Sequence, residues 1–238
     1  MDIPKQPSWM GFRSDHWPAV AGGLYLLATT GISMRSELES LLAKQRHTLP
    51  RANPIRSVFE RNLVDEDLIH KQTVPTFGRH RVALVRLSEE GKEVCRTFGW
   101  TVIQCEWERL VKLHSANRQP QHTGAIVVFA HHARLRGWKA QVLPQIGSPV
   151  FFPDLVVERD EQRIYVEVEL GSRKHQKWCN MQEAQGFVAL CARTPKSRQS
   201  LITECRQVGT IGLATDLTTL YRESKNSDIG PLWAEDWS

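Results

Sequence analysis

Two neighbouring runs of residues constrain the fold of this chain more than any other feature. Residues 151–158 and 163–170 are both rich in β-branched and aromatic side chains, and a polar link, residues 159–162, separates them. This pattern predicts a β-hairpin. If the hairpin folds about the centre of the link, Asp154 lies directly opposite Glu167.

The alternation of side chains along these strands predicts an acidic face. Asp154, Glu167 and Glu169 should share one face with Phe152 and Tyr165, whereas aliphatic side chains fill the other. Like charges opposite each other destabilise a strand pair, so this face calls for a cation. We expect Mg²⁺ (or Mn²⁺), since Mg²⁺ is usually held by one or two carboxylates together with waters and substrate phosphates. The alternative is an amphipathic hairpin whose acidic face is simply solvated.

The elements expected around the hairpin resemble a nuclease fold. They are helices over residues 123–135, 173–185 and 197–208, and strands over residues 139–143, 187–191 and 210–215. This order, with Pro153-Asp154 and Glu167-Val168-Glu169 on the hairpin, resembles the PD-(D/E)xK nuclease superfamily over residues 121–221. The resemblance implies a restriction-endonuclease-like mixed β-sheet flanked by helices. The chain as a whole would then be α/β, or α+β overall.

The resemblance also implies roles for individual residues. Asp154 and Glu167 would hold Mg²⁺, with a main-chain carbonyl next to Glu169 as a further ligand. The lysine of the motif is replaced by Glu169, which would act as an additional ligand or as a base. Some members of the superfamily supply the lysine from a neighbouring element, and the candidates for a catalytic lysine here are Lys174 and Lys177. Taken singly, either lysine is more commonly a solvated residue at a helix start.

His122 begins the helix expected before the hairpin. Its position would allow it to reach the acidic face. A capping or surface histidine is nevertheless the default expectation for a residue at a helix start.

The first part of the chain resembles a second family. Helices are expected over residues 17–28 and 34–43 and from Asn53-Pro54 onward, strands over residues 68–74 and 80–87, and a last helix from Ser88. This order, closed by Leu87-Ser88-Glu89-Glu90-Gly91, resembles the winged helix-turn-helix family, which implies a DNA-binding domain over residues 10–98. By that resemblance the third helix enters the major groove and the hairpin, or wing, contacts the backbone.

The winged-helix resemblance implies a set of DNA-binding residues. Arg56, Ser57 and Arg61 on the third helix would contact base edges or phosphates, and Lys71, Arg79, His80 and Arg81 on the wing would contact phosphates. One alternative is a basic turn that is merely solvated. Another is a winged helix that binds protein, which would show as indifference to DNA at low salt.

The remaining segments complete the domain prediction. A connecting helix and linker occupy residues 99–121, the nuclease-like domain residues 122–222, and a polar, loosely held tail residues 223–238. The five cysteines form no Cys-x-x-Cys pair, so neither a zinc site nor a disulfide framework is expected.

Composition and charge indicate the compartment and the partners. The formal net charge is +5, which is consistent with a polyanionic partner such as DNA. No apolar run approaches the length of a membrane span, and the N-terminus lacks the layout of a secretory signal. The expected localisation is cytoplasmic, without a membrane partner. Proteins of this kind often act as homodimers or in larger nucleoprotein assemblies, although no dimer seam is visible in the sequence.

Two functions remain open from the sequence. The first is a metal-dependent DNA endonuclease, a hydrolase of phosphodiester bonds, targeted by the winged helix. The second is a DNA-binding regulator, or a plasmid or mobile-element replication factor, whose nuclease fold no longer cuts. The layout of Gln121-His122, Arg136-Gly137-Trp138 and the acidic hairpin also resembles, more loosely, the replication-relaxation family of mobile-element proteins. The acidic trio favours the first function, and the missing lysine favours the second.

Overall fold

The computed structural model describes residues 4–11, 14, 16–44, 58–114, 119–144, 152–171, 175–225 and 229–238. The fold is mixed α/β, and the chain divides into two compact units. We call Met1–Thr73 with Val82–Val111 the N-terminal unit, and Val74–Arg81 with Lys112–Ser238 the C-terminal unit. None of the described helices is both long and apolar enough to cross a membrane.

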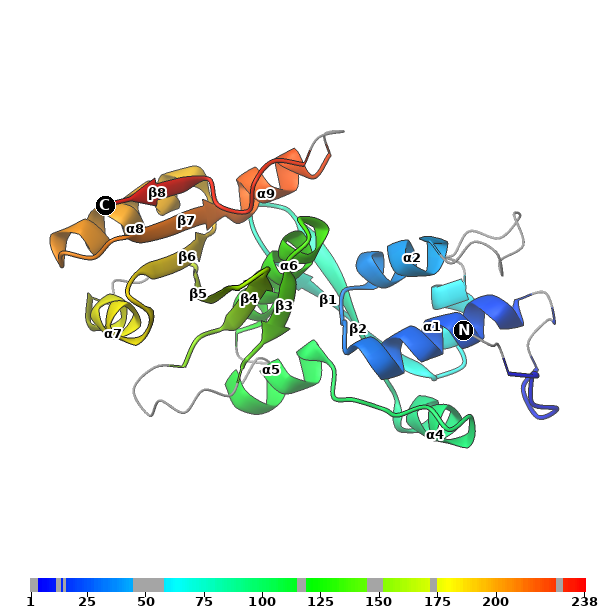
Figure 1. Cartoon of the computed structure of the whole chain (residues 1–238). Coiled ribbons are helices and arrows are strands. Elements are labelled where there is room, and N and C mark those ends of the chain that lie inside the picture. Colours follow the sequence, from blue (N-terminus) through cyan, green and yellow to red (C-terminus); the bar gives the residue numbers. More distant parts are fainter. Residues whose placement is uncertain are drawn as a thin grey trace. The chain divides into compact units, whose positions relative to one another are not determined.

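The first half of the chain folds into helices and one hairpin (Figure 1). Its elements are α1 (Trp17–Thr30), α2 (Arg35–Lys44), a π-helix (Val58–Val64), β1 (Ile69–Pro75), β2 (Arg81–Leu87), α4 (Glu89–Thr97) and α5 (Glu106–His114). The helices and strands expected here are present with small shifts at their ends. The part of the third helix expected over residues 54–57 lies outside the described residues.

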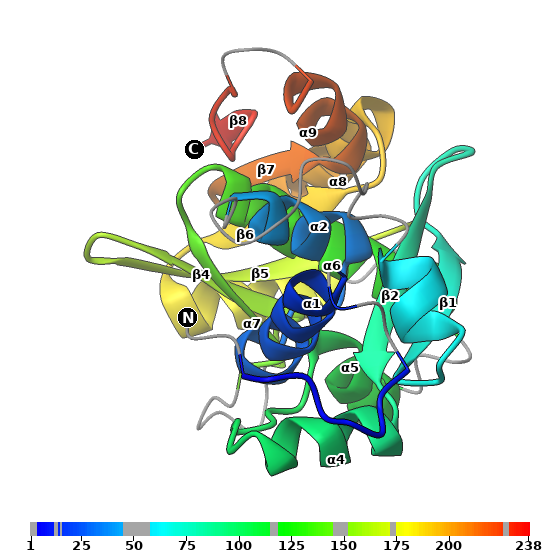
Figure 2. The same ribbon diagram turned by 90° about the vertical axis from the view of Figure 1, so that its right-hand side faces the viewer.

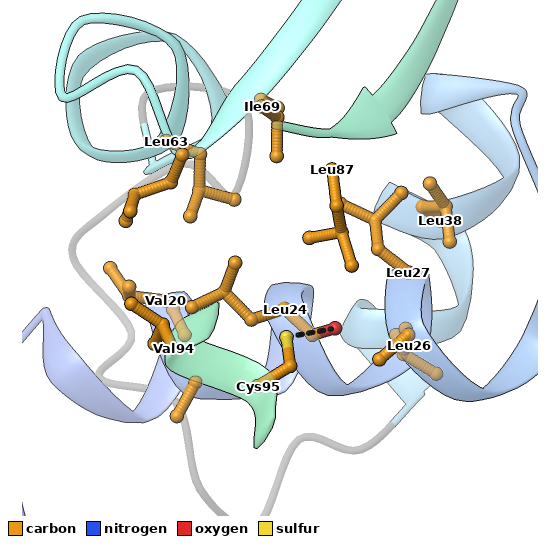
Figure 3. Close-up of a cluster of buried hydrophobic side chains, with 14 of the residues drawn as sticks. Val20, Leu24, Leu26, Leu27, Leu38, Leu63, Ile69, Leu87, Val94 and Cys95 are labelled. Carbon is orange, nitrogen blue, oxygen red and sulfur yellow. Dashed lines mark hydrogen bonds between the residues drawn. The ribbon is translucent and has the colours of Figure 1, made fainter. Parts of the chain in front are cut away.

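The core of the N-terminal unit gathers around α1 (Figure 3). Val20, Leu24 and Leu27 recur at helical spacing and are almost completely buried. The side chains packed with them in Figure 3 include Leu38, Leu63, Ile69, Leu87, Val94 and Cys95. Burial raises the pKa of the Cys95 thiol to about 12, so this cysteine is an inert core residue.

Close packing at the start of α4 explains the residues that follow the β1–β2 hairpin. Ser88 caps α4, because its hydroxyl accepts a hydrogen bond of 2.9 Å from the backbone N–H of Gly91. A Cβ atom added at Gly91 would lie only 2.0 Å from the carbonyl oxygen of Leu68. The start of α4 therefore approaches the backbone before β1 at a distance that only glycine permits.

The C-terminal unit is built on one six-stranded sheet (Figures 1 and 2). Its elements are α6 (Pro120–Leu135), β3 (Lys139–Val142), β4 (Leu155–Arg159), β5 (Gln162–Glu169), α7 (His175–Gln185), β6 (Val188–Ala192), α8 (Pro195–Gln207), β7 (Gly212–Asp216), α9 (Leu217–Glu223) and β8 (Glu235–Trp237). The expected order of helix, three strands, helix, strand, helix and strand is confirmed. The strands lie in sequence order, with β5, β6 and β7 parallel and the other neighbours antiparallel.

Helices cover both faces of this sheet. In Figure 1, α6 and α9 lie on one side of the sheet and α7 and α8 on the other. The central strand β6 is buried at every residue, as expected for a parallel strand covered on both faces. From α6, Ile126 and Phe129 are fully buried.

The register of the β4–β5 hairpin agrees with the register derived from the sequence. Leu155 pairs with Val166 and Arg159 with Gln162, so the same register places Asp154 opposite Glu167. The two-residue turn between the strands contains Asp160 at φ +55°. Aspartate tolerates this left-handed conformation better than most residues, which suits the polar link to a tight turn.

The expectation of a loosely held C-terminal tail is wrong. Residues Glu235–Trp237 form β8, the edge strand that pairs with β7. Trp237 is only 5% exposed, and its indole N–H donates a hydrogen bond of 2.8 Å to the Thr210 carbonyl. A strand of three residues is too short to show alternation in the sequence, and the folded domain therefore extends past residue 222.

Candidate functional site

Asp154 lies where β4 begins, and its carboxylate bridges to β5. Asp154 Oδ2 accepts a hydrogen bond of 2.8 Å from the backbone N–H of Val168. Its own carbonyl accepts a 2.8 Å hydrogen bond from Leu143 N–H. The side chain is buried. Its carboxylate takes the place of the backbone carbonyl that a longer β4 would offer to Val168 N–H. The residue is therefore held in a fixed orientation at the end of the hairpin.

Glu167 is buried beside a lysine from α7. Its residue exposure is 1%, and Lys177 Nζ lies 2.5 Å from Glu167 Oε2. The two groups lie within ion-pair distance, and apart from Lys177 no donor meets a carboxylate oxygen of Glu167 in the described part of the chain. Of the two lysine candidates, Lys177 thus reaches the site, whereas Lys174 lies outside the described residues.

His122 is a member of the site, and the expectation of a surface or capping histidine is wrong. Its Nε2 atom lies 2.9 Å from the carbonyl oxygen of Val168 and 3.3 Å from Asp154 Oδ2. Because a carbonyl can only accept, Nε2 carries the proton in this contact. The only signal in the sequence was the position of His122 at the start of an apolar helix next to the acidic hairpin.

Opposing effects set the pKa values of Asp154 and His122. Burial alone would raise the pKa of Asp154, but the hydrogen bond and charge of His122 and the charge of Lys177 outweigh it and lower the pKa to about 2. Burial opposes the charged form of His122, yet the hydrogen bond and charge of Asp154 raise the pKa of the imidazole. Asp154 is therefore anionic over the whole physiological range of pH.

The pKa of Glu167 is shifted in the opposite direction to that of Asp154. Burial first, and then repulsion by the Asp154 carboxylate, raise its pKa well above the usual range, although Lys177 acts against both. Burial disfavours the charged form of Lys177, but attraction to Glu167 and Asp154 raises the pKa of the ammonium. Without another cation, the site therefore holds one permanent anion, one ammonium and a glutamate that tends to keep its proton.

Glu169 does not join the other two carboxylates as a metal-binding group. Its Oε1 atom accepts hydrogen bonds from the backbone N–H groups of Leu170, at 3.1 Å, and Gly171, at 3.3 Å. Among the residues that the structure describes, no three His, Cys, Asp or Glu side chains lie close enough together to hold a metal ion. All three acidic residues are buried, so the alternative of a solvated acidic face is also wrong.

The smaller set of Asp154 and Glu167 nevertheless fits a hard divalent cation. Mg²⁺ is commonly held by only one or two carboxylates and keeps several waters. Glu167 is buried, and Lys177 compensates its charge only in part, so a divalent cation would further stabilise the acidic pair. The carbonyl of Val168, the residue after Glu167 on β5 and the one whose N–H binds Asp154, would be the main-chain ligand.

The residues expected to contact DNA are divided between the two units, and some of them lie outside the described residues. Arg56 and Ser57 lie outside the described residues. Arg61, on the π-helix, and Lys71, on β1, are exposed in the N-terminal unit. Arg79 and Arg81 are also exposed, but they belong to the C-terminal unit.

His80 is not placed as a charged phosphate contact. Its ring stacks on Phe77, with centroids 4.8 Å apart, and meets the ring of Tyr221 at 4.4 Å. Its Nδ1 atom lies 2.9 Å from the hydroxyl of Thr76. Burial, together with the charge of Lys225, lowers the pKa of the imidazole. The neutral form of the imidazole is therefore favoured, and the ring packs at the hairpin tip.

Comparison with known proteins adds no further guide to the function. No family model matches the chain, and neither curated proteins nor solved structures gave a match.

Proposed function

We propose that this chain is a metal-dependent DNA endonuclease of the PD-(D/E)xK type, which hydrolyses phosphodiester bonds and is targeted to DNA by a winged helix. The observation that carries the proposal is the contact of Lys177 with Glu167, beside the Asp154 carboxylate. The motif requires an ammonium at this place, and the strand offers only Glu169. A lysine on the next helix supplies the missing charge.

The acidic pair and the Val168 carbonyl would hold Mg²⁺ or Mn²⁺. When bound, such an ion would stabilise the charge that builds on the scissile phosphate and lower the pKa of a nearby water. The hydrogen bonds from Val168 N–H and His122 keep the Asp154 carboxylate oriented toward this position.

The remaining groups of the site would act on the phosphate and the water. Lys177 is an ammonium at neutral pH and would stabilise the negative charge of the phosphate during hydrolysis. Glu169 keeps one carboxylate oxygen on the backbone of the following residues, which leaves the group oriented to accept a proton as a base. Each of these roles needs the phosphate to approach the end of the β4–β5 hairpin.

Positive charge outside the site supports a DNA substrate. The exposed side chains of Arg61, Lys71, Arg79 and Arg81 offer contacts to phosphates, and the chain carries a net charge of +5. Such contacts give binding that weakens steeply with salt. The same chemistry is consistent with a cytoplasmic protein whose partner is DNA.

A second candidate function is a DNA-binding regulator or mobile-element replication factor with an inactive nuclease fold. The position of Glu169 favours it, because a carboxylate stands where the motif has a lysine and bonds back to its own backbone. This candidate would retain salt-sensitive DNA binding without any cleavage.

A cleavage assay separates the two candidates. Plasmid and linear DNA are incubated with the full chain and Mg²⁺ or Mn²⁺, using wild type, Asp154→Asn and Lys177→Met. The matched controls are Asp236→Asn and Lys196→Met, which carry the same changes at exposed positions. We expect cleavage by wild type and both controls, and loss of cleavage with retained DNA binding in the two site variants. Binding without cleavage by wild type would establish the regulator instead.

A further inference from the structure

The hairpin tip, Val74–Arg81, packs within the C-terminal unit and meets the first turn of α6. The side-chain amide of Gln121 donates a hydrogen bond of 2.9 Å to the Thr76 carbonyl. One turn later, a Cβ atom added at Gly124 would lie 2.9 Å from the Pro75 carbonyl oxygen and 2.9 Å from a methyl group of Val74. The face of α6 that carries residues 121 and 124 therefore lies directly on the backbone of the tip.

Hydrogen bonds and ring contacts hold the hairpin tip in one conformation. The Thr76 N–H donates to the His80 carbonyl at 3.0 Å, and the Thr76 hydroxyl contacts His80 Nδ1 at 2.9 Å. Phe77 is 8% exposed and lies against His80 and Tyr221, which is part of α9. Because α9 also packs on α6, the tip is held between two helices of the same unit.

The neighbouring residue on α6 points into the candidate site. Successive residues on a helix are rotated by about 100°, so Gln121 can face the tip while His122 faces the sheet. His122 Nε2 reaches the Val168 carbonyl at 2.9 Å and Asp154 Oδ2 at 3.3 Å. The first turn of a helix has few intrahelical hydrogen bonds of its own, so side-chain contacts at this turn fix its place.

We propose that His122 is a positioning residue for the metal-binding oxygens, and that the hairpin tip holds it in place through Gln121 and Gly124. This inference rests on the proposed function. His122 contacts two oxygens of the site, the Val168 carbonyl and Asp154 Oδ2. Oδ2 also accepts from Val168 N–H, so the ion would take the other carboxylate oxygen of Asp154 and the second lone pair of the Val168 carbonyl. Removing such an outer-shell hydrogen bond costs 10- to 100-fold in metal affinity or activity in known sites, roughly.

The test measures Mn²⁺ binding to the full chain, without DNA, by electron paramagnetic resonance of free Mn²⁺. His122→Phe removes the donor, whereas His122→Gln keeps an N–H donor that can reach the carbonyl. Gln121→Leu removes only the hydrogen bond to the tip, and Phe77→Ala loosens the tip itself. Arg79→Ala, an exposed residue of the same tip, is the control.

The expected pattern distinguishes positioning from simple packing. We expect Kd for Mn²⁺ to rise about tenfold or more in His122→Phe and less in His122→Gln. Gln121→Leu should raise Kd severalfold while the melting temperature changes little, and Arg79→Ala should leave Kd unchanged. The hydrogen bond of Gln121 to the tip affects the ion only by holding His122 in place. The double variant Gln121→Leu/His122→Phe should therefore bind Mn²⁺ no more weakly than His122→Phe alone.

Three outcomes would overturn the inference. If His122→Phe binds Mn²⁺ as wild type does, the histidine has no positioning role, although the metal site and the proposed function stand. If the losses in the double variant add, the tip acts independently of His122. If wild type binds no Mn²⁺ at all, the metal site is wrong and this inference fails with it.

Discussion

Replacing Glu167 by glutamine should stabilise the metal-free protein while it abolishes cleavage. The side chain is 1% exposed, and apart from Lys177 no donor meets its carboxylate oxygens in the described part of the chain. The nearby Asp154 carboxylate repels the ionised form, and Lys177 compensates only in part. Glutamine has nearly the same shape, carries no charge and can donate a hydrogen bond.

The size of the effect follows from the cost of a buried carboxylate whose charge Lys177 compensates only in part. That cost is about 1–3 kcal/mol, and part of the gain is lost because Lys177 loses its anionic partner. We therefore expect Glu167→Gln to gain about 1–2 kcal/mol at pH 8. For a unit of this size the gain corresponds to a rise in melting temperature of roughly 3–8 °C.

The gain should depend on pH in a defined direction. The pKa of Glu167 is raised in the folded state, so the folded state holds this proton more tightly than the unfolded state does. The wild type therefore keeps its full stability below the unfolded pKa of 4.5 and loses part of it as pH rises through the folded value. The advantage of Glu167→Gln should be absent near pH 4.5 and grow as the pH is raised toward 9.

The assay is differential scanning calorimetry of both proteins in EDTA across this pH range, repeated with Mg²⁺. Mg²⁺ should raise the melting temperature of wild type and leave that of Glu167→Gln unchanged. Glu161→Gln, in the exposed turn of the same hairpin, should change stability by less than about 0.5 kcal/mol. A lower melting temperature for Glu167→Gln at pH 8, or a gain that is independent of pH, would refute the reasoning.

Three further changes test other parts of the structure. Trp237→Ala should cost about 3–5 kcal/mol, because it empties a buried site and leaves the Thr210 carbonyl without its donor; urea unfolding that matches wild type would contradict the placement of β8. Gly91→Ala should fold poorly, since its Cβ would lie 2.0 Å from the Leu68 carbonyl; a native circular-dichroism melt would exclude that close approach. Arg61→Ala should weaken DNA binding and reduce the slope of log K against log salt by about 1, and an unchanged slope would remove Arg61 from the interface.

The sequence predicted the hairpin and its register because both depend on local patterns. Alternation over residues 151–170 defines two strands, and the polar link between them leaves one symmetric way to pair them. The opposition of Asp154 and Glu167 follows from that symmetry alone. The order of helices and strands was accessible for the same reason, since each element carries its own periodicity.

The surroundings of the acidic face were not accessible from the sequence. Alternation cannot tell a solvated face from one covered by a helix, and here α7 brings Lys177 onto Glu167. His122 and the edge strand β8 were missed for a related reason. A single histidine and three terminal residues carry no periodic signal, and their places are fixed only by tertiary contacts.

The charges of the site bear on the choice between the two proposed functions. Asp154, Glu167 and Glu169 are all buried, and the partly exposed ammonium of Lys177 lies beside Glu167. In the absence of a metal, the charge is reduced by a proton retained on Glu167 and by the raised pKa of His122. An inactive scaffold would gain stability by neutralising Glu167, whereas a cation site needs this acid despite its cost. The repulsion between the buried carboxylates of Asp154 and Glu167 destabilises the metal-free protein, and a divalent cation would relieve it. If so, Mg²⁺ stabilises wild type but not Glu167→Gln.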